Sequence, residues 1–160
     1  MKIIEDDLST PEIADFLRHH LADMNALTPP ESVHALDLEA LRAPEITFWS
    51  VRDGSSVAAC GALKRLTPTH AELKSMRTDP TRQRTGLASR LLTHIINEAT
   101  ARGYNRLSLE TGSAAPYLPA RRLYEKFGFT YCAPFADYTP DPNSVHMTKP
   151  LRAAIPAPNQ

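Results

Sequence analysis

The sequence has no excess charge of either sign. Its 160 residues carry 18 basic and 18 acidic side chains, which gives a net charge of zero at pH 7. Proteins that bind DNA or RNA through the phosphates usually carry a basic excess, so we expect no nucleic-acid partner. The apolar runs are also short, far below the ~20 residues that a membrane span requires. We therefore expect no membrane partner either.

Cysteine is scarce, with Cys60 and Cys132 as the two examples. Two cysteines are too few for a disulfide scaffold, and their apolar, strand-like surroundings predict buried, reduced thiols. The N-terminal segment is acidic early on and lacks a secretory pattern. The histidines show no spacing typical of metal ligands, so we expect no metal. These observations favour a cytoplasmic protein.

The hydrophobic pattern predicts one mixed α/β domain. Apolar residues recur with a helical period over 13–24 and from 87 onward. Strand-like segments at 46–51, 57–66 and 71–78 predict an antiparallel meander, and the helix that follows predicts a right-handed crossover to a strand at 106–111. A short helix at 120–127 and strands at 129–132 and 145–148 complete the chain. We expect the domain to span 1–151 and residues 152–160 to form a disordered tail.

A charged turn leads directly into the strongest amphipathic helix. The segment from Arg82 to Leu92 reads RQRTGLASRLL. The first turn of a helix offers unpaired N–H groups and a partial positive charge, which together bind phosphate. Gly86 permits close approach to the backbone, and Arg84 adds positive charge. The P-loop and dinucleotide fingerprints are absent. The segment predicts a pyrophosphate cradle, with a solvated, capped helix start as the alternative.

Two motifs resemble those of the GNAT family of N-acetyltransferases. Gln83 to Ala88 (QRTGLA) is similar to the Q/R-x-x-G-x-G/A signature, and Ala120 to Phe129 (ARRLYEKFGF) is similar to A-x-x-L-Y-x-K-x-G-F. The two motifs occur in the same order and at the same separation as in the family. The resemblance covers about residues 1–150, and it points to a subgroup of small bacterial single-domain enzymes. It implies a mostly antiparallel twisted sheet of six to seven strands with about four helices. Tyr117 departs from the pattern, because many relatives carry Asn there.

The same resemblance implies acetyl-CoA as co-substrate. Its pyrophosphate would lie on the loop and helix start, and the backbone N–H of Met76 would face the thioester oxygen, at a strand bulge. The cofactor contacts implied by the resemblance come from four segments: Met76, Arg77 and Thr78; Gln83, Arg84, Thr85, Gly86, Leu87, Ala88 and Ser89; Thr111 and Ser113; and Arg122, Tyr124 and Lys126.

Acetyl transfer to an amine requires a base, a donor to the developing oxyanion and a proton for the leaving thiolate. By resemblance Tyr124 is the candidate acid, and its alternative is a packed core aromatic. Glu72 is the candidate base. Regular alternation would put Glu72, Lys74, Met76 and Thr78 on one face of a strand. The alternative for Glu72 is a structural ion pair with Lys74.

The acceptor is the least defined part of the site. Candidate acceptor-binding residues are His20, Ser32, His34, Trp49 and Lys74. The alternatives are a surface or structural role for the histidines and a core position for Trp49. We also expect the segment from Pro134 to Ser144 to close over the cleft.

The leading hypothesis is an N-acetyltransferase that acts on a primary amine of a small molecule by direct transfer in a ternary complex. The alternatives are a protein or peptide N-acetyltransferase and a non-catalytic acyl-CoA sensor. The protein is expected to be a monomer or a homodimer.

Overall fold

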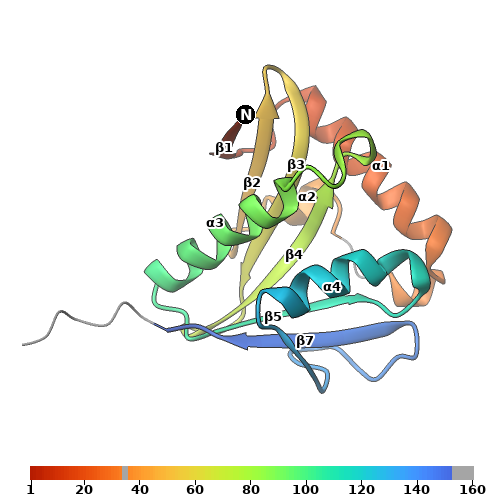
Figure 1. Cartoon of the computed structure of the whole chain (residues 1–160), viewed down its shortest axis with the longest axis vertical. Helices are drawn as coiled ribbons and strands as arrows, with labels where there is room; N and C mark the ends of the chain where they lie inside the picture. Colours follow the sequence, from red (N-terminus) through yellow and green to blue (C-terminus); the bar gives the residue numbers. More distant parts are fainter. Residues whose placement is uncertain (34–35, 153–160) are drawn as a thin grey trace, which may run out of the picture.

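Among the described residues, the strands form a seven-stranded sheet at the centre of the fold (Figure 1). The computed structural model describes residues 1–33 and 36–152; the predicted tail lies outside them except for Arg152. The strand order is β1-β2-β3-β4-β5-β7-β6, and the pairs are antiparallel except for β4 with β5. The strands are β1 (Lys2–Glu5), β2 (Ile46–Asp53), β3 (Ser56–Arg65), β4 (His70–Thr78), β5 (Arg106–Gly112), β6 (Thr130–Cys132) and β7 (Ser144–Pro150).

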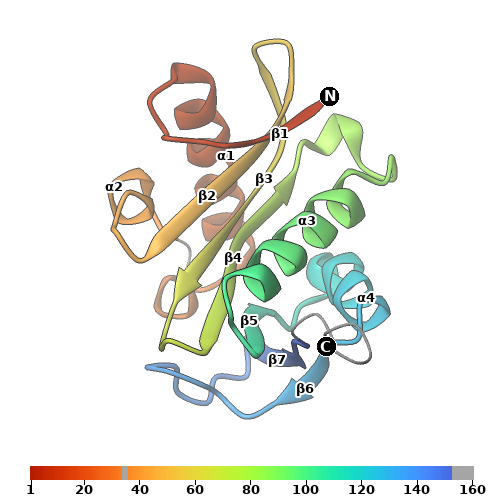
Figure 2. The same ribbon diagram turned by 90° about the vertical axis from the view of Figure 1, so that its left-hand side faces the viewer.

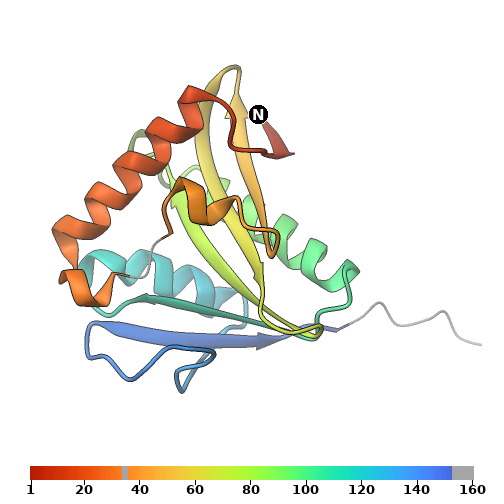
Figure 3. The same ribbon diagram turned by 180° about the vertical axis from the view of Figure 1, so that it is seen from behind.

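In the part of the chain that the structure describes, four α-helices cover the two faces of the sheet. They are α1 (Pro11–Leu27), α2 (Leu38–Leu41), α3 (Leu87–Ala101) and α4 (Leu118–Lys126), with short 3-10 turns η1 (Pro30–Ser32), η2 (Pro80–Arg82) and η3 (Ala115–Tyr117). Figure 2 shows α3 and α4 on one face, and Figure 3 shows α1 and α2 on the other. The predicted fold class and number of helices are confirmed.

Each face of the sheet has its own apolar core. Leu91, Leu92 and Ile95 of α3 pack with inward residues of β2 to β5 and β7, because the apolar stripe of an amphipathic helix must be buried against another element. Ile13 and Leu17 of α1 pack on the opposite face. The two helical layers therefore fix the sheet between them.

The central parallel pair separates part of the way along. β4 and β5 are paired from His70 with Arg106 to Leu73 with Leu109. Beyond that point β4 stays paired with β3, and β5 stays paired with β7 as far as Gly112. The two strands therefore diverge, and they leave an opening in the middle of the sheet.

A β-bulge corrects the predicted strand alternation. The register shifts between Cys60 and Ala62, and Ser75 opposite has φ +57°. A bulge adds one residue and reverses the later side chains. Met76 consequently packs with the α3 core, whereas Arg77 forms an ion pair with Asp23 of α1 at 2.8 Å. The prediction that Met76 shares a face with Glu72 is wrong for this reason.

The environments of the two cysteines differ. Both are free; Cys60 is buried as predicted, whereas Cys132 in the short strand β6 is only half-buried. The Cys60 thiol donates to the carbonyl of Ser75 at 3.2 Å, and burial raises the pKa of this thiol above its usual value. Cys60 therefore stabilises the bulge through this hydrogen bond, and its thiol stays protonated and unreactive.

Candidate active site

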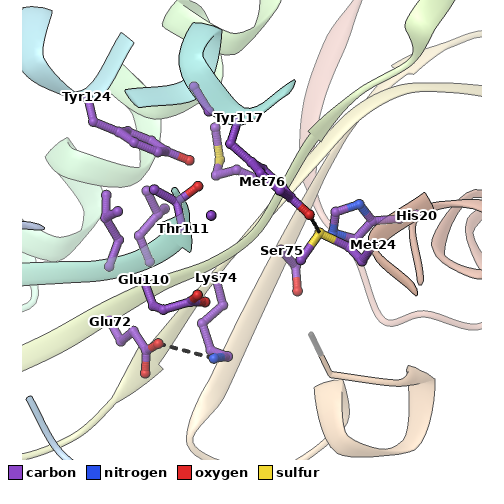
Figure 4. Close-up of a pocket in the computed structure, with 14 residues that line it drawn as sticks. His20, Met24, Glu72, Lys74, Ser75, Met76, Glu110, Thr111, Tyr117 and Tyr124 are labelled. Carbon is purple, nitrogen blue, oxygen red and sulfur yellow. Dashed lines mark hydrogen bonds and ion pairs between the residues drawn. The ribbon is translucent and has the colours of Figure 1, made fainter. Parts of the chain in front are cut away.

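A cavity of about 110 Å³ lies at the opening between β4 and β5. Figure 4 shows its lining side chains coming from α1, from both strands and from α4. The cavity thus connects the two helical layers through the sheet. Its lining residues are His20, Met24, Glu72, Leu73, Lys74, Ser75, Met76, Leu109, Glu110, Thr111, Gly112, Tyr117, Ala120 and Tyr124.

Glu72 is held at the bottom of the cavity by two neighbours. It is buried, with 2% of its surface exposed. Its Oε2 accepts a hydrogen bond from Lys74 Nζ at 3.1 Å and one from the Tyr138 hydroxyl at 2.6 Å, and Lys74 also donates to the Tyr138 hydroxyl at 2.9 Å. Hydrogen bonds and an opposite charge stabilise a buried carboxylate. The Glu72–Lys74 ion pair, which was the alternative to a role as base, is therefore present, and it lines the cavity as well.

Tyr124 reaches the cavity from the other side of the sheet. Its ring is buried against Phe129 in an edge-to-face contact with 5.8 Å between centroids, and its hydroxyl points into the cavity (Figure 4). Burial, with a smaller effect from the charge of Glu110, raises the pKa of this phenol above its usual value. Tyr124 is therefore protonated at neutral pH and can act as a hydrogen-bond donor.

The loop before α3 has the geometry of an anion site. Gly86 occupies the N-cap position with φ +83°, and no side chain among the described residues caps the helix. A Cβ at Gly86 would meet no atom within 4 Å. Glycine is therefore favoured here by the positive φ of the backbone and not by a lack of space for a side chain. Arg84 precedes it with φ +64°. The first N–H groups of α3 therefore face an open, exposed surface.

Other residues of the predicted cofactor site differ in their environments. Thr111 lines the cavity. Ser113 is engaged elsewhere, because its N–H donates to Asn143 O at 3.1 Å and its hydroxyl to Pro142 O at 2.7 Å. Arg122 and Lys126 lie exposed on α4, where Arg122 is 3.7 Å from Glu125.

The predicted acceptor residues separate into two groups. His20 and Lys74 line the cavity, and burial together with the charge of Arg77 lowers the pKa of His20 to about 4. Ser32 is buried outside the lining and accepts from Asn143 Nδ2 at 3.3 Å. His34 lies outside the described residues.

Trp49 lies away from the cavity. It is buried in the core beneath α3, where its ring meets His94 edge-on at 5.8 Å and stacks under Arg102 at 5.5 Å. Successive residues of a strand face opposite sides, so Trp49 points away from α1 while Phe48 packs toward it. The acceptor-binding prediction for Trp49 is therefore replaced by its alternative, a core position.

Two lining residues, and one residue bonded to the lining, were missed at the sequence level. Glu110 lines the cavity and accepts from the Ser144 hydroxyl at 2.8 Å, and Met24 lines it from α1. Tyr138 belongs to the segment predicted to close over the cleft, and it does contact Glu72 and Lys74. The alternation of Ser108 and Glu110 along β5 was the available signal for Glu110; the other two depend on long-range contacts.

Comparison with known proteins agrees with this geometry. The model of the acetyltransferase (GNAT) family matches residues 13–129. The chain is 58% identical over 151 residues to the N-acetyltransferase YsnE of Bacillus subtilis (strain 168), covering 94% of this chain and all of that protein. It is 50% identical over 146 residues to the N-acetyltransferase YedL of Escherichia coli (strain K12), covering 91% and 92%.

A solved structure shares the fold at low sequence identity. The structure of an aminoglycoside 6'-N-acetyltransferase in complex with coenzyme A superposes with a TM-score of 0.71 at 18% identity, over 97% of this chain and 99% of that one. The chain belongs to the acetyltransferase (GNAT) family. The class of protein is accordingly an N-acetyltransferase.

Within the described residues, no group of three or more histidine, cysteine or acidic side chains is placed to hold a metal ion. In the same part of the chain, no helix is both long and apolar enough to cross a membrane.

Proposed function

We propose that the protein transfers an acetyl group from acetyl-CoA directly to a primary amine of a small molecule, with both substrates bound at once. The observation that carries this proposal is the opening between β4 and β5. It gives one cavity access to Tyr124 from the α4 side and to Glu72 from the α1 side. Two substrates entering from opposite faces can therefore meet between an acid and a base.

In this proposal the pyrophosphate binds at the start of α3. The backbone N–H groups from Gly86 to Ser89, with the Gln83–Thr85 segment, receive the phosphate oxygens. The pantetheine arm then runs between the diverging strands, along Thr78 and Thr111. Met76 follows the bulge at Ser75, and its N–H serves as the donor to the developing oxyanion.

Glu72 takes the proton of the incoming ammonium, directly or through a water. The amine nitrogen then attacks the thioester carbon, the C–S bond breaks, and the electron pair leaves with sulfur. A Glu72 carboxylate held by Lys74 and Tyr138 is positioned before the substrates arrive, which lowers the cost of orientation in the transition state. Glu110 contributes a second carboxylate that favours a cationic acceptor.

Tyr124 assists the leaving thiolate by hydrogen bonding. A thiol has a pKa near 8.5, and the pKa of Tyr124 is raised above the ordinary phenol value. Complete proton transfer from this phenol to the thiolate is therefore uphill, whereas donation of a hydrogen bond as charge develops on sulfur is favourable. Tyr124 thus stabilises the thiolate until solvent, or the nitrogen that gives up its second proton as the amide forms, protonates it.

A small acceptor is favoured over a peptide because the cavity is small and the Tyr117 ring lines it. The experiment is a free-thiol assay with acetyl-CoA and a panel of small primary amines, compared with a panel of peptides with free N-termini. We expect turnover with one or more small amines and none with the peptides. Peptide turnover would favour the protein N-acetyltransferase instead, and binding of acetyl-CoA without any turnover would favour the sensor.

A further inference from the structure

Tyr117 lines the α1 side of the cavity, and its ring is in close contact with a glycine. Its ring rests directly on Gly112 at the end of β5, where a Cβ would come within 2.2 Å of the ring carbons. A contact that short cannot be accommodated by either backbone or ring without a shift. Gly112 is therefore a position at which a glycine makes room for one particular aromatic side chain.

The hydroxyl of Tyr117 fixes the other end of the ring. It is 2.8 Å from Thr28 Oγ1, at the C-terminal end of α1, and it donates to Met24 Sδ at 3.3 Å (Figure 4). The backbone that carries Tyr117 is held as well, because Arg121 Nη1 donates to the carbonyls of Gly112 at 2.7 Å and Ala114 at 3.0 Å. The ring thus connects β5 to α1.

The position of the ring matters for the acyl group of the cofactor. The Tyr124 hydroxyl approaches the cavity from the α4 side, where the proposed function places the thioester sulfur. An acyl chain that continues beyond the sulfur leads away from α4 toward α1. Tyr117 and Met24 line the cavity in that direction, so a longer chain meets the Tyr117 ring.

The volume of the cavity limits the length of the acyl chain that it can hold. A cavity of about 150 Å³ holds a molecule of benzene, with six carbon atoms. The cavity here has about 110 Å³. An acetyl group adds three heavy atoms beyond the sulfur and leaves space for the end of an amine, whereas a hexanoyl group adds seven heavy atoms.

We propose that Tyr117, seated on Gly112 and bound to α1, is a specificity-determining residue that restricts the acyl donor to short-chain acyl-CoA. This inference rests on the proposed function, since it assumes that acyl-CoA binds between β4 and β5. It needs no knowledge of the acceptor. Removing the ring enlarges the cavity toward α1 and admits longer chains.

The test is isothermal titration of CoA, acetyl-CoA, butyryl-CoA and hexanoyl-CoA into the wild-type protein and three variants. Tyr117→Ala removes the ring, and Tyr117→Phe keeps the ring on Gly112 while losing the hydroxyl contacts. Tyr131→Ala is the matched control, because Tyr131 is 53% exposed and bonds to Glu125 on the surface of α4. Thermal melting establishes that each variant is folded.

We expect wild type, Tyr117→Phe and Tyr131→Ala to bind hexanoyl-CoA about tenfold or more weakly than acetyl-CoA, a difference of ~1.4 kcal/mol. We expect Tyr117→Ala to bind hexanoyl-CoA more tightly than acetyl-CoA, because each buried methylene strengthens binding by about fourfold. Tighter binding of hexanoyl-CoA than acetyl-CoA by wild type would overturn the proposal, whether or not Tyr117→Ala folds. The proposal would also be overturned if Tyr117→Ala kept the wild-type preference for acetyl-CoA over hexanoyl-CoA. It would be overturned as well if Tyr117→Phe lost this preference to the same extent as Tyr117→Ala. If wild type binds neither CoA nor any acyl-CoA, the proposed function itself fails.

Discussion

Lowering the pH from 7 to 5 is predicted to destabilise the fold through His20. This side chain lines the cavity from α1, and burial, aided by Arg77, lowers its pKa from 6.5 to about 4. Between those two values the unfolded chain binds a proton that the folded chain does not, so stability falls as the pH falls. Above pH 6.5 both states are neutral at this position, and below about pH 4 both are protonated.

The magnitude follows from the two pKa values. Each unit of difference corresponds to 1.36 kcal/mol, and at pH 5 the unfolded state is largely protonated while the folded state is not. The free energy of unfolding should therefore be lower at pH 5 than at pH 7 by ~2 kcal/mol from this residue alone. For 160 residues the entropy of unfolding makes that a decrease in Tm of ~6 °C.

The assay is urea unfolding of wild type and His20→Asn at pH 7 and pH 5. Asn keeps a polar side chain of similar bulk near the backbone but does not titrate. The difference between the two proteins isolates His20 from His70, whose pKa burial also lowers. We expect His20→Asn to lose ~2 kcal/mol less than wild type over this interval. Equal losses in both proteins would refute the assignment of a His20 that stays neutral at pH 5 in the folded state.

Three further predictions concern the chemistry and the bulge. Tyr124→Phe should lower kcat by about 10²-fold with little change in acetyl-CoA affinity, because it removes a donor to the leaving sulfur; thiol release with a saturating amine measures this, and an unchanged kcat would exclude the role. Glu72→Gln should lower kcat by about 10²–10⁴-fold and keep cofactor binding by titration, whereas lost binding would indicate a structural ion pair. Gly61→Ala should cost ~1–3 kcal/mol of stability in denaturant, because the new Cβ would lie 2.6 Å from Met76 Sδ and 2.8 Å from Ile95 Cδ1; no loss would show that the bulge tolerates a side chain.

Local signals in the sequence were sufficient for the conformation of the loop before α3 and for the helix that follows it. Gly86 has the positive φ expected of a residue that opens an anion site at a helix start, and the apolar stripe from Leu87 to Ala99 is buried as its period predicts. These properties depend on residues within a few positions of one another. Backbone conformation and amphipathic pattern are therefore predictable there without a structure.

The bulge and the cavity walls depend on contacts between distant segments. The reversed Met76 side chain lies against Gly61 on the neighbouring strand, where a Cβ would come within 2.6 Å of Met76 Sδ, and nothing in the pattern of β4 marks this contact. Tyr138 contacts Glu72 across 66 positions, and Tyr117 contacts Thr28 across 89. Alternation and spacing carry no information on such pairs, so the bonds of Tyr138 to Glu72 and Lys74 and the Tyr117–Gly112 contact became visible only in the fold.

The claim that acetyl-CoA binds at the start of α3 is tested most directly by isothermal titration of acetyl-CoA into wild type, Gly86→Glu and Gly103→Glu. Both glycines have positive φ, +83° and +90°, and open space around a Cβ, but Gly103 follows the opposite end of α3. Both variants therefore carry similar backbone strain and the same added charge. We predict binding by wild type and Gly103→Glu, and a loss of about tenfold or more in Gly86→Glu. Equal affinities for all three proteins would contradict the phosphate site.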